Sequence, residues 1–140
     1  MRAPDHTRRV VVTGLGVISP VGNDRDTAWA NLLNGVSGIG EITKFDTSGY
    51  EQRAAGEVHD FVATDWMDHK AVRRSEISMH YGVAAAKQAL ADSGFEITDA
   101  NREDVGVVFG SGAGGVSMMI DSWESLKTRG PLTFAPTFIA

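Results

Sequence analysis

Two largely apolar segments, the first with Gly14 and Gly16 near its end and the second followed by glycines, restrict the possible folds of this chain more than any other feature. The first covers residues 9–18 and holds three consecutive valines, and the second covers residues 105–109 and leads into a glycine-rich turn over residues 110–115. A strand with one solvent face alternates apolar and polar residues, whereas an unbroken apolar run suits a strand buried on both faces of a parallel sheet. We therefore expect both segments to be buried strands of a largely parallel sheet.

Helical patterns separate and follow these two segments. Apolar residues at helical spacing predict a short helix over residues 27–33, a long helix over residues 71–92 and a third helix over residues 116–126. Three adjacent alanines in the long helix, Ala84 to Ala86, allow another backbone to come close to it. A further short strand is expected over residues 54–58. Alternating strands and helices of this kind predict an α/β fold.

Composition argues against several classes of protein. A hydrophobic share of 42% and a charged share of 22% fit a folded globular domain rather than a disordered chain. The net charge of -5 argues against a general nucleic-acid-binding protein, and no apolar run is long enough to cross a membrane. The first residues lack a signal-peptide pattern, so a cytoplasmic location is expected. Because the chain has no cysteine, it holds no disulfide, thiolate metal site or thiol nucleophile.

The glycine turn permits more than one interpretation. Gly110, Gly112 and Gly115 satisfy the pattern G-x-G-x-x-G after an expected strand and before an expected helix, which is the context of a dinucleotide-binding site. Such a site also needs an acidic residue about 20 positions further on, and no Asp or Glu follows Glu124. The sequence therefore favours either direct binding of another substrate or a packing role, in which the glycines let a strand and a helix lie close together.

Several landmarks, in their order along the chain, resemble the amino-terminal part of β-ketoacyl-acyl-carrier-protein synthases, the condensing enzymes of the thiolase fold. The landmarks are residues 8–16, 32–39, 45–46, 55–61, 73–74, 110–115 and 130–131. Their combination is most similar to the elongation enzymes of dissociated fatty-acid synthesis. The resemblance implies that residues 1–140 are an amino-terminal fragment of one synthase domain, truncated before the turn that carries the nucleophile. The implied architecture is the incomplete half of a thiolase-like fold, with a mixed, mostly parallel sheet and packed helices.

The resemblance also implies a reaction, a decarboxylative condensation of acyl and malonyl carrier-protein thioesters by a homodimer. In that family a cysteine becomes acylated and two histidines assist decarboxylation and stabilise negative charge. This chain contains none of these catalytic residues, so the chain alone is expected to be inactive. Its four histidines, His6, His59, His69 and His80, match no catalytic position of the family and lack metal-site spacing, so neither a metal nor a cofactor is implied.

Two sets of residues can be transferred from the family pattern. Ala113 occupies a position that lines the acyl tunnel, where isoleucine is often found, so the smaller side chain implies weaker steric exclusion of long acyl groups. Phe138 resembles a residue that closes the same tunnel from the partner subunit. Lys70, Arg73 and Arg74 lie where the family docks its acidic acyl carrier protein, and basic side chains there would steer association.

Three alternatives remain beside an elongating synthase. The first is a polyketide ketosynthase or its non-catalytic partner subunit, which the residue at the nucleophile position would distinguish. The second is a stand-alone scaffold that binds a carrier protein through the basic residues. The third is a fragment of a dinucleotide-binding oxidoreductase. The expected partners are acyl carrier protein, thioester substrates and a second copy of the parent protein, with neither nucleic acid nor membrane.

Overall fold

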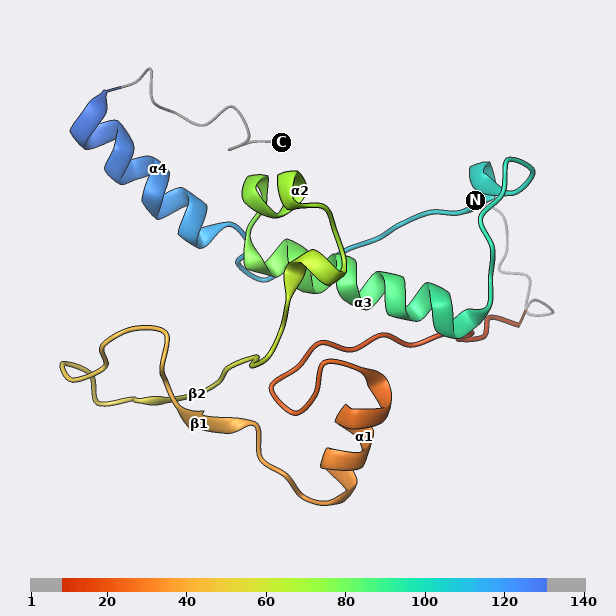
Figure 1. Cartoon of the computed structure of the whole chain (residues 1–140), viewed down its shortest axis with the longest axis horizontal. Helices are drawn as coiled ribbons and strands as arrows, with labels where there is room; N and C mark the ends of the chain where they lie inside the picture. The colour runs from red at the N-terminus through yellow and green to blue at the C-terminus, as the bar shows by residue number, and fades with distance from the viewer. Residues whose placement is uncertain (1–8, 131–140) are drawn as a thin grey trace, which may run out of the picture.

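The computed structural model describes residues 9–130. Helices dominate it, and Figure 1 shows the longest one, α3, crossing the middle of the molecule. In chain order the elements are α1 (Arg25–Leu33), β1 (Ile39–Glu41), β2 (Ala54–Gly56), the 3-10 turn η1 (Ala63–Asp65), α2 (His69–Arg74), α3 (Ile77–Ser93), the 3-10 turn η2 (Arg102–Asp104) and α4 (Val116–Arg129). None of the helices in this part of the chain combines the length and hydropathy that a bilayer span requires.

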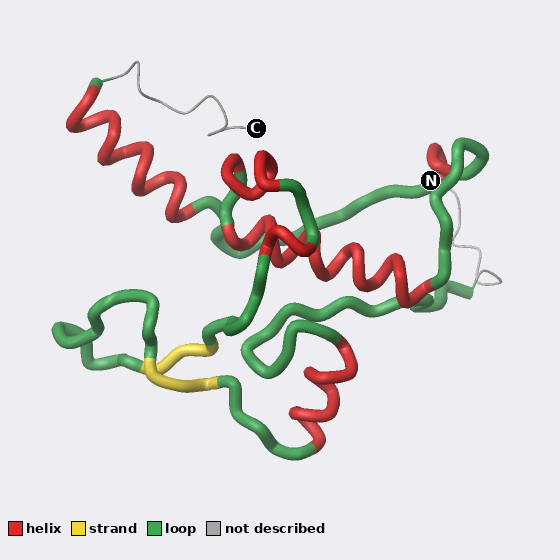
Figure 2. The backbone as a smooth tube through the Cα atoms, viewed as in Figure 1, coloured by secondary structure: helices red, strands yellow, loops and turns green. Residues whose placement is uncertain are grey.

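The two apolar segments expected to be strands are not hydrogen-bonded as strands in the described part of the chain. Both segments, residues 9–18 and 105–109, are drawn as loop in Figure 2. By the residue colours of Figure 1 they run along α3, each in the direction opposite to the helix. The side chains of Val10 and Val108 are 96% and 97% exposed. A strand needs a neighbouring extended backbone for its hydrogen bonds, and within residues 9–130 each segment has α3 beside it instead. The expectation of paired parallel strands is therefore wrong for these residues, although their extended course is as predicted.

The ladder that does form is short and antiparallel. β1 pairs with β2 in the register Ile39–Gly56, Gly40–Ala55 and Glu41–Ala54, which confirms the strand expected over residues 54–58 in its first half.

Glu57, directly after β2, fixes the connection between the two strands. Its carboxylate accepts hydrogen bonds from the Thr43 N–H (3.0 Å), the Thr43 hydroxyl (2.7 Å) and the Lys44 N–H (3.3 Å). These donors, the Thr43 hydroxyl first, lower the pKa of Glu57, and the residue is only 7% exposed.

The helix expected over residues 27–33 is confirmed as α1, beginning two residues earlier. Asp24 precedes it with extended backbone and caps it, since its carboxylate accepts from the Thr27 N–H (2.8 Å) and the Thr27 hydroxyl (2.7 Å). A carboxylate at this position satisfies a free amide of the first turn and favours the positive end of the helix dipole. The helix expected over residues 116–126 is likewise confirmed as α4.

The single long helix expected over residues 71–92 is instead two helices. α2 is capped by Asp68, which accepts from the Lys70 and Ala71 amides at 2.8 Å each, and it ends at Arg74. Ser75 and Glu76 then adopt extended backbone conformations before α3 begins. Periodicity alone does not show this interruption because the apolar residues on both sides keep helical spacing.

Small residues let the extended amino-terminal segment lie directly against α3. A Cβ atom added to Gly14 would fall 2.1 Å from the Ala89 carbonyl oxygen, and one added to Gly16 would fall 1.9 Å from that of Ala85. The close backbone approach expected from the glycines and the alanine-rich helix is therefore confirmed. Ala84, in the same helix, is completely buried.

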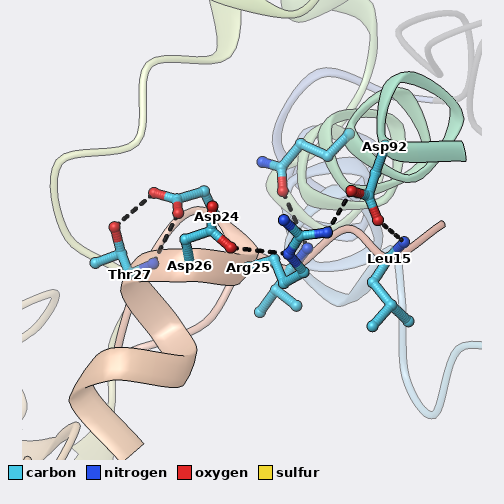
Figure 3. Close-up of polar contacts among 8 residues, drawn as sticks. Leu15, Asp24, Arg25, Asp26, Thr27 and Asp92 are labelled. Atoms are coloured by element: carbon cyan, nitrogen blue, oxygen red, sulfur yellow. Dashed lines mark hydrogen bonds and ion pairs between the residues drawn. The ribbon is translucent and has the colours of Figure 1, made fainter. Parts of the chain in front are cut away.

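Polar contacts at the carboxyl end of α3 hold α1 and the amino-terminal segment in place (Figure 3). Asp92 accepts from the Leu15 N–H at 2.9 Å and forms an ion pair with Arg25, whose guanidinium also contacts Asp26. One helical turn earlier, Gln88 accepts from the Val17 N–H at 3.0 Å. The contacts lower the pKa of Asp92, first through the Leu15 amide and then through Arg25.

Candidate functional site

The amino-terminal end of α3 brings together the features that the sequence indicates as functional. α2 ends there, and the chain returns to the same place through the glycine turn, residues 110–115, before α4 begins (Figure 1). The break between α2 and α3 creates this junction, because it leaves Glu76 with an extended backbone at the start of α3.

Glu76 connects the start of α3 to the glycine turn. One carboxylate oxygen accepts short hydrogen bonds from the Gly115 N–H and the Ser78 hydroxyl, and the other accepts from the Ser117 hydroxyl at 3.1 Å. The residue is only 9% exposed. Donation by Ser78 and then by Gly115 lowers the pKa of Glu76, so the carboxylate stays ionised at neutral pH.

The same carboxylate lies between two helix amino termini. Glu76 is the residue at the N-cap of α3, and Gly115 is the residue at the N-cap of α4, where it adopts a left-handed conformation with φ 85°. A negative charge is favourable near the positive end of each helix dipole. Glu76 contacts the start of α4 from a distant part of the sequence, through the Gly115 N–H and the Ser117 hydroxyl.

The turn itself is exposed and weakly packed. Residues 110–114 are exposed, and their internal support is a hydrogen bond from the Gly114 N–H to the Ser111 hydroxyl oxygen at 2.9 Å. Gly115 is the position at which the backbone requires glycine, since its φ lies in the left-handed region. The turn therefore depends for its position on contacts made at its end.

A groove of about 610 Å³ runs between α3 and the turn. Its lining residues are Ser78, Met79, Tyr81, Gly82, Val83, Phe109, Gly110, Ser111 and Gly112. The Phe109 ring covers Gly82 so closely that a Cβ atom added there would lie 3.0 Å from the ring. Ala113 comes directly after the last lining residue and is exposed in the turn. The groove is predominantly apolar, and its lining includes the hydroxyl-bearing residues Ser78, Tyr81 and Ser111, a composition that suits a largely apolar ligand.

The basic residues singled out in the sequence share one short helix. Lys70, Arg73 and Arg74 all lie on α2 at positions i, i+3 and i+4, which places them on neighbouring parts of one face. All three are exposed, and within residues 9–130 none of them forms an ion pair. The structure thus presents three exposed cations on one short helix.

The histidines do not form a site. His59 and His69 are exposed, whereas His80 is 7% exposed in α3 and places its Nε2 atom 3.1 Å from the Ser75 hydroxyl oxygen. Within the described residues, three metal-binding side chains nowhere come together. Two residues named from the sequence, His6 and Phe138, lie outside the described part of the chain.

The geometry argues against a dinucleotide at the glycine turn. A dinucleotide-binding fold places the pyrophosphate on the free amides at the amino terminus of the following helix. Here the Gly115 amide at the start of α4 already donates to the Glu76 carboxylate. A buried negative charge at this position would repel a phosphate. A Cβ atom added to Gly110, Gly112 or Gly115 would meet nothing within 4 Å, so the close strand–helix packing considered for these glycines is not seen either.

Glu76 is the site residue that sequence reasoning missed. Asp, Asn, Ser and Thr are the preferred residues at the start of a helix, because their short side chains reach the first-turn amides. The longer glutamate side chain at the start of α3 was the one local signal of a partner elsewhere in the chain. Its partners, Gly115 and Ser117, are 39 and 41 positions away and could not be identified from local sequence.

Comparison with known proteins places these features in a family. The sequence profile described as "Beta-ketoacyl synthase, N-terminal domain" matches residues 7–139. Two curated proteins named 3-oxoacyl-acyl-carrier-protein synthase 2 align over 132 residues, one from Vibrio harveyi at 46% identity and one from Coxiella burnetii at 42%. Each alignment covers 94% of this chain and 32% of the relative, so the chain spans about a third of the length of these relatives.

A solved structure extends the comparison to three dimensions. The structure titled "The ishigamide ketosynthase/chain length factor" superposes with a TM-score of 0.71 at 32% identity, covering 94% of this chain and 33% of the other. The thiolase-like class expected from the sequence is therefore confirmed, although the described residues do not form the expected parallel strand pairs.

Proposed function

Because this chain belongs to the β-ketoacyl synthase family, we propose that it is the amino-terminal part of an elongating 3-oxoacyl-acyl-carrier-protein synthase of fatty-acid synthesis. The observation that supports the proposal most strongly is the alignment, at 42–46% identity over nearly the whole chain, with relatives that carry this name. In this proposal residues 1–140 form one continuous part of a single synthase domain, and the nucleophile belongs to sequence beyond this chain.

The reaction we propose for the complete protein forms one carbon–carbon bond. An acyl group is transferred from a carrier thioester to a cysteine thiolate, and a malonyl thioester loses CO₂ to produce a carbanion. The carbanion attacks the acyl-enzyme carbonyl, and the cysteine thiolate leaves as the 3-oxoacyl thioester forms. This chain supplies none of the reacting side chains, so its proposed contribution is the binding of the acyl chain and of its carrier.

The groove beside the glycine turn is the part of this chain that we assign to the acyl group. Its apolar wall combines the Phe109 ring, Met79 and Val83 with the backbone of the turn. Ala113 follows the lining residues directly, and we propose that it borders the path of the growing chain. Phe138 is proposed, from the family pattern alone, to close that path from a second copy of the protein.

The exposed cations of α2 are the part that we assign to the carrier. Lys70, Arg73 and Arg74 are exposed, share one face and have no ion-pair partner within residues 9–130. Exposed cations attract an acidic partner and orient it by long-range electrostatics. We accordingly propose acyl carrier protein as the partner, a homodimer as the complete enzyme, and the cytoplasm as its location.

A condensation assay with the complete protein tests this proposal. Acyl carrier protein loaded with an acyl primer and with malonate is incubated with the enzyme, and the 3-oxoacyl product and CO₂ are measured. We expect equimolar formation of both products. The polypeptide of residues 1–140, assayed in parallel, should form neither. Formation of the condensation product by residues 1–140 alone would contradict the assignment of the catalytic residues to the remaining sequence.

A polyketide ketosynthase or its chain-length partner is the second candidate, favoured by the superposition on a ketosynthase/chain length factor structure. The two candidates differ in the residue at the nucleophile position and in oligomeric state. A cysteine at that position together with a homodimer favours the elongating synthase. Another residue there, or an obligatory complex with a second, different subunit, favours the alternative.

A further inference from the structure

The Glu76 carboxylate links the glycine turn and the start of α4 to the start of α3. It accepts hydrogen bonds from the Gly115 N–H and the Ser117 hydroxyl. Residues 110–114 are exposed and rich in glycine, so they have few side-chain contacts of their own. Glycine backbones have many accessible conformations. A turn of this composition therefore keeps one conformation only when contacts with other parts of the chain stabilise it.

Residues on both sides of the groove are connected to the Glu76 carboxylate. Gly110, Ser111 and Gly112 form one side of the groove, and Ser78 contributes to the other side. Ser78 donates its hydroxyl to the Glu76 oxygen that also accepts from Gly115. Glu76 therefore links Ser78 on one side of the groove to Gly115, which follows the residues of the other side.

An ionised carboxylate is the group that these contacts require. Glu76 accepts three hydrogen bonds, from Ser78, Gly115 and Ser117, and donates none. A glutamine keeps one acceptor oxygen for Ser78 and Gly115, and its NH₂ group could donate to the Ser117 hydroxyl oxygen, but it carries no charge to strengthen these hydrogen bonds. The loss of a charge-assisted hydrogen bond at a site that is 9% exposed weakens the connection without removing side-chain volume.

We propose that Glu76 is a positioning residue for acyl-chain selection, which holds the glycine turn against α3 and so determines the width of the acyl groove. This inference rests on the proposed function. Glu76 itself touches no reacting atom in this proposal, because it acts through Ser78 and through the backbone of the turn. Its removal should therefore change the preference among acyl lengths more than it changes the overall capacity for condensation.

Glu57 provides a matched control. It is also a buried glutamate, 7% exposed, and it also accepts from backbone amides and a hydroxyl. Its donors, Thr43 and Lys44, belong to the connection between β1 and β2, and it does not line the groove. The variants Glu76→Gln and Glu57→Gln thus remove equivalent interactions, one at the turn and one elsewhere.

The experiment compares both variants in the complete protein. The ratio of kcat/KM for a long acyl primer to that for a short one is measured, together with hydrogen exchange of the Gly115 amide. We expect Glu76→Gln to change the ratio by about tenfold, the equivalent of one charged hydrogen bond, and to accelerate exchange at Gly115. Glu57→Gln should leave both readouts as in the wild type. An unchanged ratio with an unchanged exchange rate in Glu76→Gln would overturn the inference.

Two further measurements keep the outcomes distinct. Should Glu76→Gln fail to fold, Glu76→Asp takes its place, since it retains both carboxylate oxygens on a side chain one methylene shorter. We expect it to change the kcat/KM ratio and the Gly115 exchange rate in the same direction but by less. No change in either quantity would count against the inference. Should the wild-type protein condense no acyl primer at all, the proposed function fails. The exchange of Gly115 then still decides whether Glu76 holds the turn.

Discussion

Gly16 lies so close to α3 that a Cβ atom on it would be 1.9 Å from the carbonyl oxygen of Ala85. No Cβ atom tolerates such a distance from an oxygen. The oxygen belongs to the backbone of a helix, which cannot move away by a change of rotamer as a side chain can. The pairing of Gly16 with Ala85 therefore sets how closely the amino-terminal segment approaches the longest helix.

Gly16→Ala should destabilise the protein, because the added methyl group forces the segment away from α3 and breaks contacts along its length. We expect a loss of at least about 2 kcal/mol in the free energy of unfolding, the scale of overpacking in a close contact. Urea unfolding of the complete protein measures it. Gly40→Ala is the control, since a Cβ at Gly40 meets nothing within 4 Å, and it should change stability by less than about 0.5 kcal/mol. Equal losses in the two variants would contradict the packing account.

The close contact at Gly16 is also the kind of feature that could be predicted from the sequence. Glycines in an extended segment and alanines in a helix both report small volume, and small volume on two elements indicates that they pack closely. The helices α1 and α4 were predictable for a similar reason, because helical spacing and caps such as Asp24 are local properties. Each of these features is encoded within a few neighbouring residues.

Features that depend on distant partners could not be predicted in this way. The apolar pattern of residues 9–18 and 105–109 indicates extended chain, but strand pairing depends on a second extended backbone, which the described residues do not place beside them. The break at Ser75 and Glu76 is stabilised by partners about 40 residues away. In the candidate site, the glycine motif located the turn, whereas the roles of Ala113 and of the basic residues rested on family resemblance.

The cap of α1 provides a local test of stability. Asp24→Ala removes the acceptor for the Thr27 amide and hydroxyl, and we expect it to cost about 1 kcal/mol of unfolding free energy. Asp24→Asn keeps an acceptor oxygen in the same place and should recover most of the loss. Thermal unfolding of both variants measures the difference. If asparagine and alanine lowered the melting temperature equally, capping would not be the role of Asp24.

Acidification should destabilise the protein through its two buried glutamates. Hydrogen bonds lower the pKa of Glu57, first through the Thr43 hydroxyl, and that of Glu76, first through the Ser78 hydroxyl. A pKa that is lower in the folded state than in the unfolded state contributes stability above the unfolded pKa, and that contribution is lost as the pH falls through the folded pKa. Stability should therefore decline as the pH drops below about 5.

Urea unfolding between neutral and acidic pH measures this decline. The double variant Glu57→Gln, Glu76→Gln cannot ionise at these positions, so its stability should be lower at neutral pH and should fall less steeply in acid. If the free energy of unfolding fell equally with pH in the wild type and the double variant, the two carboxylates would not be the cause of the acid destabilisation.

Charge reversal on α2 tests carrier docking. Arg73→Glu combined with Arg74→Glu replaces two exposed cations of α2 with anions, and we expect KM for carrier-bound substrates to rise by about tenfold or more because like charges repel. KM for small thioesters without a carrier should stay as in the wild type. The matched control is Lys44→Glu with Arg102→Glu, two exposed positions on other parts of the chain. Equal KM changes in the two double variants would indicate a general effect of net charge rather than docking on α2.

Enlarging Ala113 tests the acyl assignment of the groove. Ala113 follows the lining residue Gly112 and carries the smallest side chain that still has a Cβ, so isoleucine or phenylalanine there would occupy space that we assign to the distal part of a long acyl chain. We expect Ala113→Ile and Ala113→Phe to lower kcat/KM for long primers by about tenfold or more, as steric exclusion of a few methylenes implies, and to shift products toward shorter chains. Short primers should react as in the wild type.

Ala113→Ser, which changes polarity with little change in volume, is the control and should keep the original profile of product lengths. The product lengths are measured by mass spectrometry, and a profile that is the same for alanine, serine, isoleucine and phenylalanine would remove Ala113 from the acyl path.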